Sequence, residues 1–140
     1  MLPESLSLDI VTPEKRLVSM AVGEVVLPGS EGSMGVLPGH APLLTALSVG
    51  ELVYRSASVR HYVAIAWGFA EVLPDRISIL AETAERGEEI DRDRAERARD
   101  RALQHLKSRD AEVDFKRAQV ALQKALIRLQ TSSHARGESI

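Results

Sequence analysis

The segment from Glu31 to Leu44, E-G-S-M-G-V-L-P-G-H-A-P-L-L, constrains the fold more than any other part of the sequence. Its three glycines accept positive φ, and its two prolines fix φ near about −65° and each remove a backbone donor. A helix is therefore excluded, and the segment predicts a strand, a tight turn and a second strand. The corner from Gly39 to Ala41 is expected to be exposed, where it can contact a partner. The side chains expected in the core are Met34, Val36, Leu37, Leu43 and Leu44.

The composition predicts a folded protein. A chain of 140 residues with 44% hydrophobic residues can form one domain, or a small domain with an appendage. The absence of cysteine excludes a disulfide framework and a thiolate metal site. A bilayer-spanning helix needs about 20 consecutive apolar residues, and the sequence has no such run, so we expect no direct membrane insertion. The net charge of −2 is too small to indicate a nucleic-acid partner.

The first part of the chain has the alternating pattern of β-strands. Leu6, Leu8 and Ile10 alternate with Ser7, Asp9 and Val11. Turn residues follow at Thr12 to Lys15. Short strands at near-regular spacing predict an antiparallel β-sandwich or barrel. Tyr62, Trp67 and Phe69 are expected to pack in its core or across its strands. The further strands are predicted at Arg16–Met20, Gly23–Leu27, Gly35–Leu37, Glu51–Arg55, Arg60–Ala66, Gly68–Leu73 and Arg76–Ala81.

The pattern changes at Glu82, beyond which proline is absent and Ala, Arg, Glu and Leu dominate. Asp91 can cap a helix that continues to about Lys107, and a second helix is predicted from about Ala111 to Gln130. A short loop between two helices makes an antiparallel hairpin. The predicted fold is therefore α+β, with a β-sandwich at 1–86, a helical hairpin at 87–131 and a flexible tail at 132–140.

Alanine-rich stripes run along one face of each predicted helix. Because alanine buries little area, the hairpin is expected to hold together only marginally, so that it can open and dock again. The residues of the stripes are Ala95, Ala98, Ala102 and Leu106 in the first helix, and Ala118, Ala121, Leu122, Ala125, Leu126 and Leu129 in the second.

Basic residues flank the alanine stripes and are expected to converge along one seam when the hairpin is closed. They are Arg94 and Arg101 on the first helix, and Arg117, Lys124 and Arg128 on the second. Cations so close together repel unless an anion lies between them, and a phosphate-bearing ligand would satisfy that requirement. The alternative is a solvated helix surface with i,i+4 ion pairs such as Asp93 with Arg97.

Two motifs resemble one family. L-S-L-D-I-V-T-P-E at Leu6 to Glu14 and S-E-G-S-M-G-V-L-P-G-H-A-P-L-L-T-A-L at Ser30 to Leu47 are similar to the ε subunit of bacterial F-type ATP synthases, equivalent to the mitochondrial δ subunit. The resemblance implies a β-sandwich with a helical hairpin, and a non-catalytic rotor component bound to the γ subunit and the c-ring loops. It also implies a peripheral position on the cytoplasmic face of the bacterial plasma membrane, with no required cofactor.

The resemblance assigns two groups of site residues. Glu31, Gly32, Ser33 and His40 match positions at the end of the sandwich that contacts the c-ring and γ. In the family the hairpin opens, extends to the α and β subunits and inhibits ATP hydrolysis, and some members bind ATP on the closed hairpin through a motif similar to I-D-x-x-R-A. The matching residues here are Ile90, Asp91, Arg94 and Ala95, with Arg101, Lys124, Arg128 and Glu85, and Lys124 stands where arginine is found in the family pattern.

Other classes of function remain as alternatives. One is a free-standing β-sandwich that binds a ligand, with the hairpin as a dimerisation arm. An enzyme is disfavoured, because no nucleophile, base and orienting group come together. Ser56, Ser58 and His61 are close in sequence, but a strand places alternate residues on opposite faces. His40 shows no ligand spacing with the other histidines, so no metal site is predicted.

Overall fold

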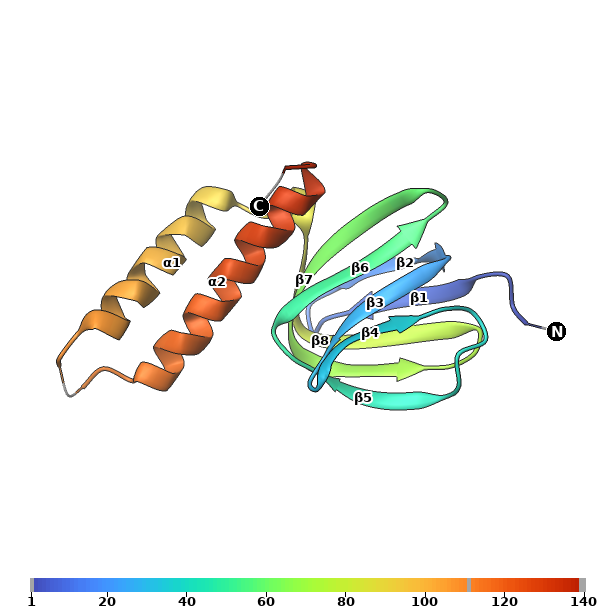
Figure 1. Cartoon of the computed structure of the whole chain (residues 1–140), viewed down its shortest axis with the longest axis horizontal. Helices are drawn as coiled ribbons and strands as arrows, with labels where there is room; N and C mark the ends of the chain where they lie inside the picture. The colour runs from blue at the N-terminus through green and yellow to red at the C-terminus, as the bar shows by residue number, and fades with distance from the viewer. Residues whose placement is uncertain (1, 111, 139–140) are drawn as a thin grey trace.

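The computed structural model describes residues 2–110 and 112–138, which form eight strands, a short 3-10 helix and two α-helices (Figure 1). The predicted class, a β-sandwich followed by a helical hairpin, is confirmed. The strands are β1 (Leu6–Val11), β2 (Arg16–Val22), β3 (Glu24–Gly29), β4 (Gly32–Val36), β5 (Leu43–Leu47), β6 (Gly50–Ser56), β7 (Val59–Val72) and β8 (Arg76–Arg86). The helices are η1 (Gly87–Glu89), α1 (Arg92–Lys107) and α2 (Phe115–Ala135).

Strand β7 organises the sandwich. It was predicted as two strands and is one strand of 14 residues, whose first half pairs with β6 and whose second half pairs with β5. The strand bends where Trp67 and Gly68 both have positive φ, at 59° and 135°. Next to the bend, the chain leaves β5 and enters β6, so the sheet folds over itself into two layers. The sheet order is β2-β1-β8-β7-β5-β3-β4, with β6 beside β3 and β7, and β1 pairs with β8 in parallel.

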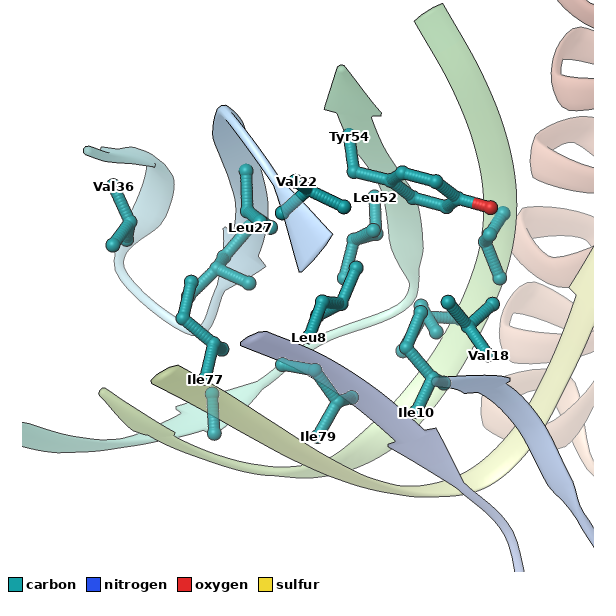
Figure 2. Packing of buried hydrophobic residues seen from close by; sticks show 14 of the residues in the cluster. Leu8, Ile10, Val18, Val22, Leu27, Val36, Leu52, Tyr54, Ile77 and Ile79 are labelled. Carbon is teal, nitrogen blue, oxygen red and sulfur yellow. The ribbon is translucent and has the colours of Figure 1, made fainter. Parts of the chain in front are cut away.

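The core lies between the two layers and is filled by alternate strand residues. Leu8 and Ile10 of β1 stand opposite Ile77 and Ile79 of β8, and their side chains meet those of the other layer (Figure 2). Tyr54 is the largest fully buried side chain, and its burial raises the pKa of the phenol above its usual value of 10.0. Regular alternation in β1 and β8 therefore encodes the core correctly.

Several apolar side chains that were expected in the core are exposed. Val36 is fully buried, but Leu37, Leu43 and Leu44 are exposed, so their predicted burial is wrong. Leu43 and Leu44 are consecutive residues of β5, and consecutive strand residues point to opposite faces. Trp67 and Phe69 are also exposed, so a place in the core is wrong for them. The other predicted placement, across the strands, agrees with the register, in which Phe69 stands opposite Ala46 and Leu80.

The hairpin begins as predicted but extends further than predicted. Asp91 caps α1, and its side chain accepts a hydrogen bond from the Arg94 N–H at 3.1 Å. The predicted start of the second helix at Ala111 lies outside the described residues, and α2 begins at Phe115 after the N-cap Asp114.

The second helix also ends later than predicted, at Ala135 instead of Gln130. The Glu138 N–H donates to the Ser133 carbonyl at 2.9 Å, and the Gly137 N–H donates to the His134 carbonyl at 3.1 Å. With Gly137 at a φ of 72°, these two bonds form a Schellman motif, which closes the helix. Residues 132–135, predicted to belong to a flexible tail, therefore form the last turn of α2.

Helix α2 lies between α1 and the sandwich (Figure 1). The last turns of α2 pack against η1, where Gly87 makes the closest approach. A Cβ atom on Gly87 would lie 2.6 Å from Ala135 Cβ and 2.7 Å from the Thr131 carbonyl oxygen. Glycine is thus required at this junction for α2 to reach the sandwich. Neither described helix has a stretch long and apolar enough to cross a membrane.

The bend in β7 gives a prediction for Gly68. A Cβ atom there would lie 2.0 Å from the Leu80 carbonyl oxygen, and the positive φ would be strained with any side chain. Gly68→Ala should destabilise the chain by about 3 kcal/mol and lower the urea midpoint of unfolding. Gly35→Ala is the matched control, because its Cβ would meet no atom within 4 Å and should change stability by less than about 0.5 kcal/mol. Equal midpoints for the two variants would contradict the bend.

Candidate functional site

An apolar row crosses the outer face of the sandwich beyond the bend in β7. The strand register places Ala46, Phe69, Leu80 and Val11 opposite one another on β5, β7, β8 and β1. Phe69 is 58% exposed and Leu80 is 60% exposed. Together with Trp67 and Pro13, these residues line a shallow hollow of about 620 Å³, and we call this surface the apolar face.

A polar row borders the apolar face. The next register position carries Glu71, Ser78 and Asp9 on β7, β8 and β1, while β5 contributes the exposed, apolar Leu44. An apolar centre with a polar edge is the usual arrangement of a protein interface. The sequence analysis missed this surface, although one signal was present, because Phe69 shares a strand face with the charged Glu71.

The predicted contact between the alanine stripes is confirmed. Ala95 and Ala102 on α1 and Ala118 and Ala125 on α2 are buried, and each pair is seven residues apart. Ala121 and Leu126 are exposed, so their predicted place in the buried stripe is wrong. The fully buried stripe residues of both helices are thus alanines, whose methyl groups bury little area per residue.

The residues of the predicted ATP motif lie at the start of α1. Ile90 is buried, Asp91 caps the helix, Arg94 is exposed, and Ala95 is buried in the seam with α2. The Asp91 carboxylate therefore has a structural function in this conformation, since it satisfies a free N–H group of the first helical turn.

Three other residues of the predicted set come together between α2 and β8. Arg128 donates from Nε to Oε1 of Glu85 at 2.7 Å and from Nη2 to Oε2 at 3.2 Å. This two-bond geometry pairs the guanidinium with a carboxylate. Lys124 lines the same cavity, whose volume of about 60 Å³ is far below the roughly 300 Å³ of a small ligand pocket. A nucleotide therefore cannot fit there while Glu85 holds Arg128.

The remaining basic residues lie elsewhere. Arg101 and Arg117 line a hollow of about 500 Å³ between the two helices, near the connecting loop, together with Glu112 and Asp114. The prediction that the basic residues of both helices share one seam is wrong. Helix α2 has Arg117 on the side of α1, and it has Lys124 and Arg128 on the side of the sandwich.

The two predicted contact segments of the sandwich lie apart. Glu31 is in the turn between β3 and β4, which also brings Gly32 and Ser33 to the surface. His40 follows the other end of β4, where the Gly39 N–H donates to the Pro74 carbonyl at 2.8 Å. The prediction that these residues share one end of the sandwich is wrong, because a whole strand separates them.

A contact that the sequence analysis missed joins the end of α2 to the sandwich. His134 Nδ1 lies 2.8 and 2.9 Å from the two carboxylate oxygens of Glu51, and the Tyr62 ring packs beside the imidazole. His134 was placed in a flexible tail. Gly137 was the available signal, because glycine commonly follows the last residue of a helix.

Comparison with known proteins gives consistent matches over most of the chain. Residues 5–87 match the family described as ATP synthase, Delta/Epsilon chain, beta-sandwich domain, and residues 88–133 match the ATP synthase, Delta/Epsilon chain, long alpha-helix domain. An ATP synthase epsilon chain of Nitratidesulfovibrio vulgaris is 48% identical over 94% of this chain and 98% of its own length. Another, from Syntrophobacter fumaroxidans, is 50% identical over 92% of this chain and 96% of its own length.

Solved structures give a similar result. A chain in the Euglena gracilis mitochondrial ATP synthase, in a structure of OSCP, F1 and the c-ring, superposes with a TM-score of 0.78 and 25% identity, covering 88% of this chain and 78% of that one. A chain in the central stalk and c-ring of the Tetrahymena thermophila mitochondrial ATP synthase has a TM-score of 0.57 and 17% identity, covering 93% of this chain and 95% of that one. The second match supports the fold alone.

Proposed function

Since this chain belongs to the family of delta and epsilon chains of ATP synthase, as a non-catalytic subunit, we propose that it acts as a rotor component of the central stalk. In this role it couples the catalytic head to the membrane c-ring. The similar chain of the Euglena gracilis mitochondrial ATP synthase comes from a structure of OSCP, F1 and the c-ring, which supports this position for the present chain. Family membership also favours this function over a free-standing ligand-binding module.

The observation that carries the proposal is the apolar face, whose proposed occupant is the γ subunit of the central stalk. Phe69 and Leu80 expose large apolar areas at its centre, and the row with Glu71 and Asp9 supplies a polar border. Burying such a surface against a partner is favourable at roughly 25 cal/mol per Å² of apolar area.

The turn at Glu31, Gly32 and Ser33 is proposed to contact the c-ring loops. The turn is exposed and lies at the end of the sandwich opposite His40, so the two segments face different partners. His40 is then assigned to a contact with the central stalk. Contact with the c-ring places the chain at the periphery of the bacterial plasma membrane, on its cytoplasmic face.

The γ contact is tested by placing a charge at the centre of the apolar face. Phe69→Glu should raise the Kd for purified γ by about 30-fold or more, because the carboxylate would be buried without a partner. Val59→Glu is the control, since Val59 is 55% exposed at the start of β7, outside the apolar face. Isothermal titration measures both affinities, and equal Kd values would place γ on another surface.

The hairpin is proposed to inhibit ATP hydrolysis by opening and extending along γ to the α and β subunits. The thin alanine seam supports this proposal, because Ala95, Ala102, Ala118 and Ala125 bury little area when the helices close. Helix α1 lies on the far side of α2 from the sandwich, so it can separate without breaking the β-sandwich (Figure 1).

Removal of the hairpin tests inhibition. The assembled complex should hydrolyse ATP several-fold faster with a chain that ends at Glu88 than with the full chain, because the inhibitory helices are missing. The truncated chain must first be shown to bind γ with unchanged affinity, since its β-sandwich and apolar face are intact. Equal hydrolysis rates would exclude the inhibitory function and leave the structural one.

ATP is proposed as a regulatory ligand of the hairpin through Arg94, Arg101, Lys124 and Arg128, with the Ile90–Ala95 motif and Glu85. Because Arg101 lies between the two helices and Lys124 and Arg128 face the sandwich, the helices must shift for one ATP to contact all of these residues. The ion pair between Arg128 and Glu85 must open for this, because the cavity beside it is too small for a nucleotide. At an ATP concentration equal to the Kd, binding stabilises the closed hairpin by RT ln 2, about 0.4 kcal/mol. Regulation therefore requires that the closed and the extended hairpin have nearly equal free energies.

Thermal unfolding of the isolated full chain tests ATP binding. Millimolar ATP should raise the unfolding midpoint, and Arg94→Ala and Arg128→Ala should each abolish the rise because they remove a phosphate-binding cation. Arg76→Ala is the control, since this exposed arginine begins β8, away from the hairpin, and should leave the rise unchanged. The absence of any rise with the unaltered chain would exclude ATP as a ligand.

A further inference from the structure

Two glutamates stand in one row on the face of the sandwich that α2 covers. Glu51 of β6 and Glu85 of β8 are each directly opposite Ala64 of β7. Directly opposed residues share a sheet face, so the two carboxylates flank Ala64 beneath the helix. Helix α2 meets both of them, with Arg128 at Glu85 and His134 at Glu51.

The contact of His134 is close, and it is shielded from solvent on the side of Glu51 more than on the side of the imidazole, which is 34% exposed. Its Nδ1 lies 2.8 and 2.9 Å from the two oxygens of Glu51, whose side chain is only 10% exposed. The Tyr62 ring lies with its centroid 5.2 Å from the imidazole centroid and limits its movement. A nearly buried carboxylate requires a cation or several hydrogen bonds, since its desolvation is otherwise unfavourable.

The two cations of α2 differ in how they respond to pH. Arginine keeps its charge at every physiological pH, whereas histidine is the side chain whose charge ordinarily changes between about pH 5 and 8. A protonated imidazole gives Glu51 a charge-assisted hydrogen bond, and a neutral imidazole gives it only a weaker one. The Glu85 contact is therefore constant, and the Glu51 contact depends on the protonation of His134.

We propose that His134 and Glu51 form a proton-dependent latch that holds the end of α2 on the sandwich, so that lower pH favours the docked hairpin. This deepens the proposed regulation, because the docked hairpin is the state that does not inhibit. A protonated imidazole strengthens docking through its charge-assisted hydrogen bond to Glu51.

Other charged groups near the latch leave Glu51 as the carboxylate partner of His134. On the same segment, Glu138 is held by Arg92 at 3.0 Å, so its charge is already compensated. Arg136 caps α2, and its side chain is exposed. Tyr62 faces the imidazole from β7. The acidic residues of η1, which packs against α2, are the exposed Glu88 and Glu89.

The packing of the last turns of α2 explains why their docking on the sandwich depends on the contact between His134 and Glu51. Thr131 and Ser132 are fully buried, and in the described part of the chain neither hydroxyl has a hydrogen-bond partner. A buried hydroxyl without a partner opposes docking, because it gives up its bonds to water. The flanking contacts at Glu51 and Glu85 must offset this loss, so a change in one of them alters how often the last turns of α2 open.

Amide hydrogen exchange in the isolated full chain tests the latch. Protection factors of residues 129–135, corrected for the intrinsic pH dependence of exchange, report local opening even when the docked state dominates. Between pH 8 and pH 6 protection should rise roughly three- to tenfold, as expected for a partly exposed charge-assisted bond. His134→Gln and Glu51→Gln should each abolish the rise, and His105→Gln, at an exposed site on α1, should retain it.

A permanent charge provides the complementary test. His134→Lys should give protection that no longer depends on pH between 6 and 8, because lysine stays protonated opposite Glu51. Protection of the unaltered chain that does not change with pH, or an equal rise in His134→Gln, would overturn the latch. These measurements concern docking alone, so they are independent of whether removal of the hairpin changes the hydrolysis rate of the assembled complex.

Discussion

The bend of β7 at Trp67 and Gly68 is the constraint on which the rest of the structure depends. Before the bend, Val63 and Ile65 point into the core, and after it Ala70 and Val72 do. The inward positions thus change from odd to even numbers, which a regular strand cannot do. The positive φ values at the bend make this change, and only glycine fits at position 68, against the Leu80 carbonyl.

The same bend separates the two outer surfaces of the sandwich. On its outer face, the first half of β7 carries Tyr62 and Ala64 and is covered by α2. On its outer face, the second half of β7 carries Phe69 and is open to solvent. The first surface receives the hairpin through polar and charged contacts, and the second is apolar. A subunit built in this way can stay attached to a partner through the open face while its hairpin docks or leaves.

The hairpin is held by contacts of different kinds, and none of them is strong. Alanine methyl groups join the two helices, an ion pair and a histidine–carboxylate contact join α2 to the sheet, and two unsatisfied hydroxyls oppose docking. Partly exposed ion pairs each contribute only about 1 kcal/mol or less. Small changes in ligand or proton binding are therefore sufficient to shift such an equilibrium.

The sequence by itself determined the class of the fold, the change from strands to helices near Gly87, the cap at Asp91 and the alanine seam. Each of these follows from local rules, namely alternation in β1 and β8, helix capping and the spacing of small residues on one helix face. The tertiary structure decided which side of β7 faces outwards, how the basic residues divide between two sides of α2, and that Glu51 meets His134. Those outcomes depend on a backbone bend and on contacts between residues far apart in the chain, such as Glu51 and His134, and no local pattern of residues records them.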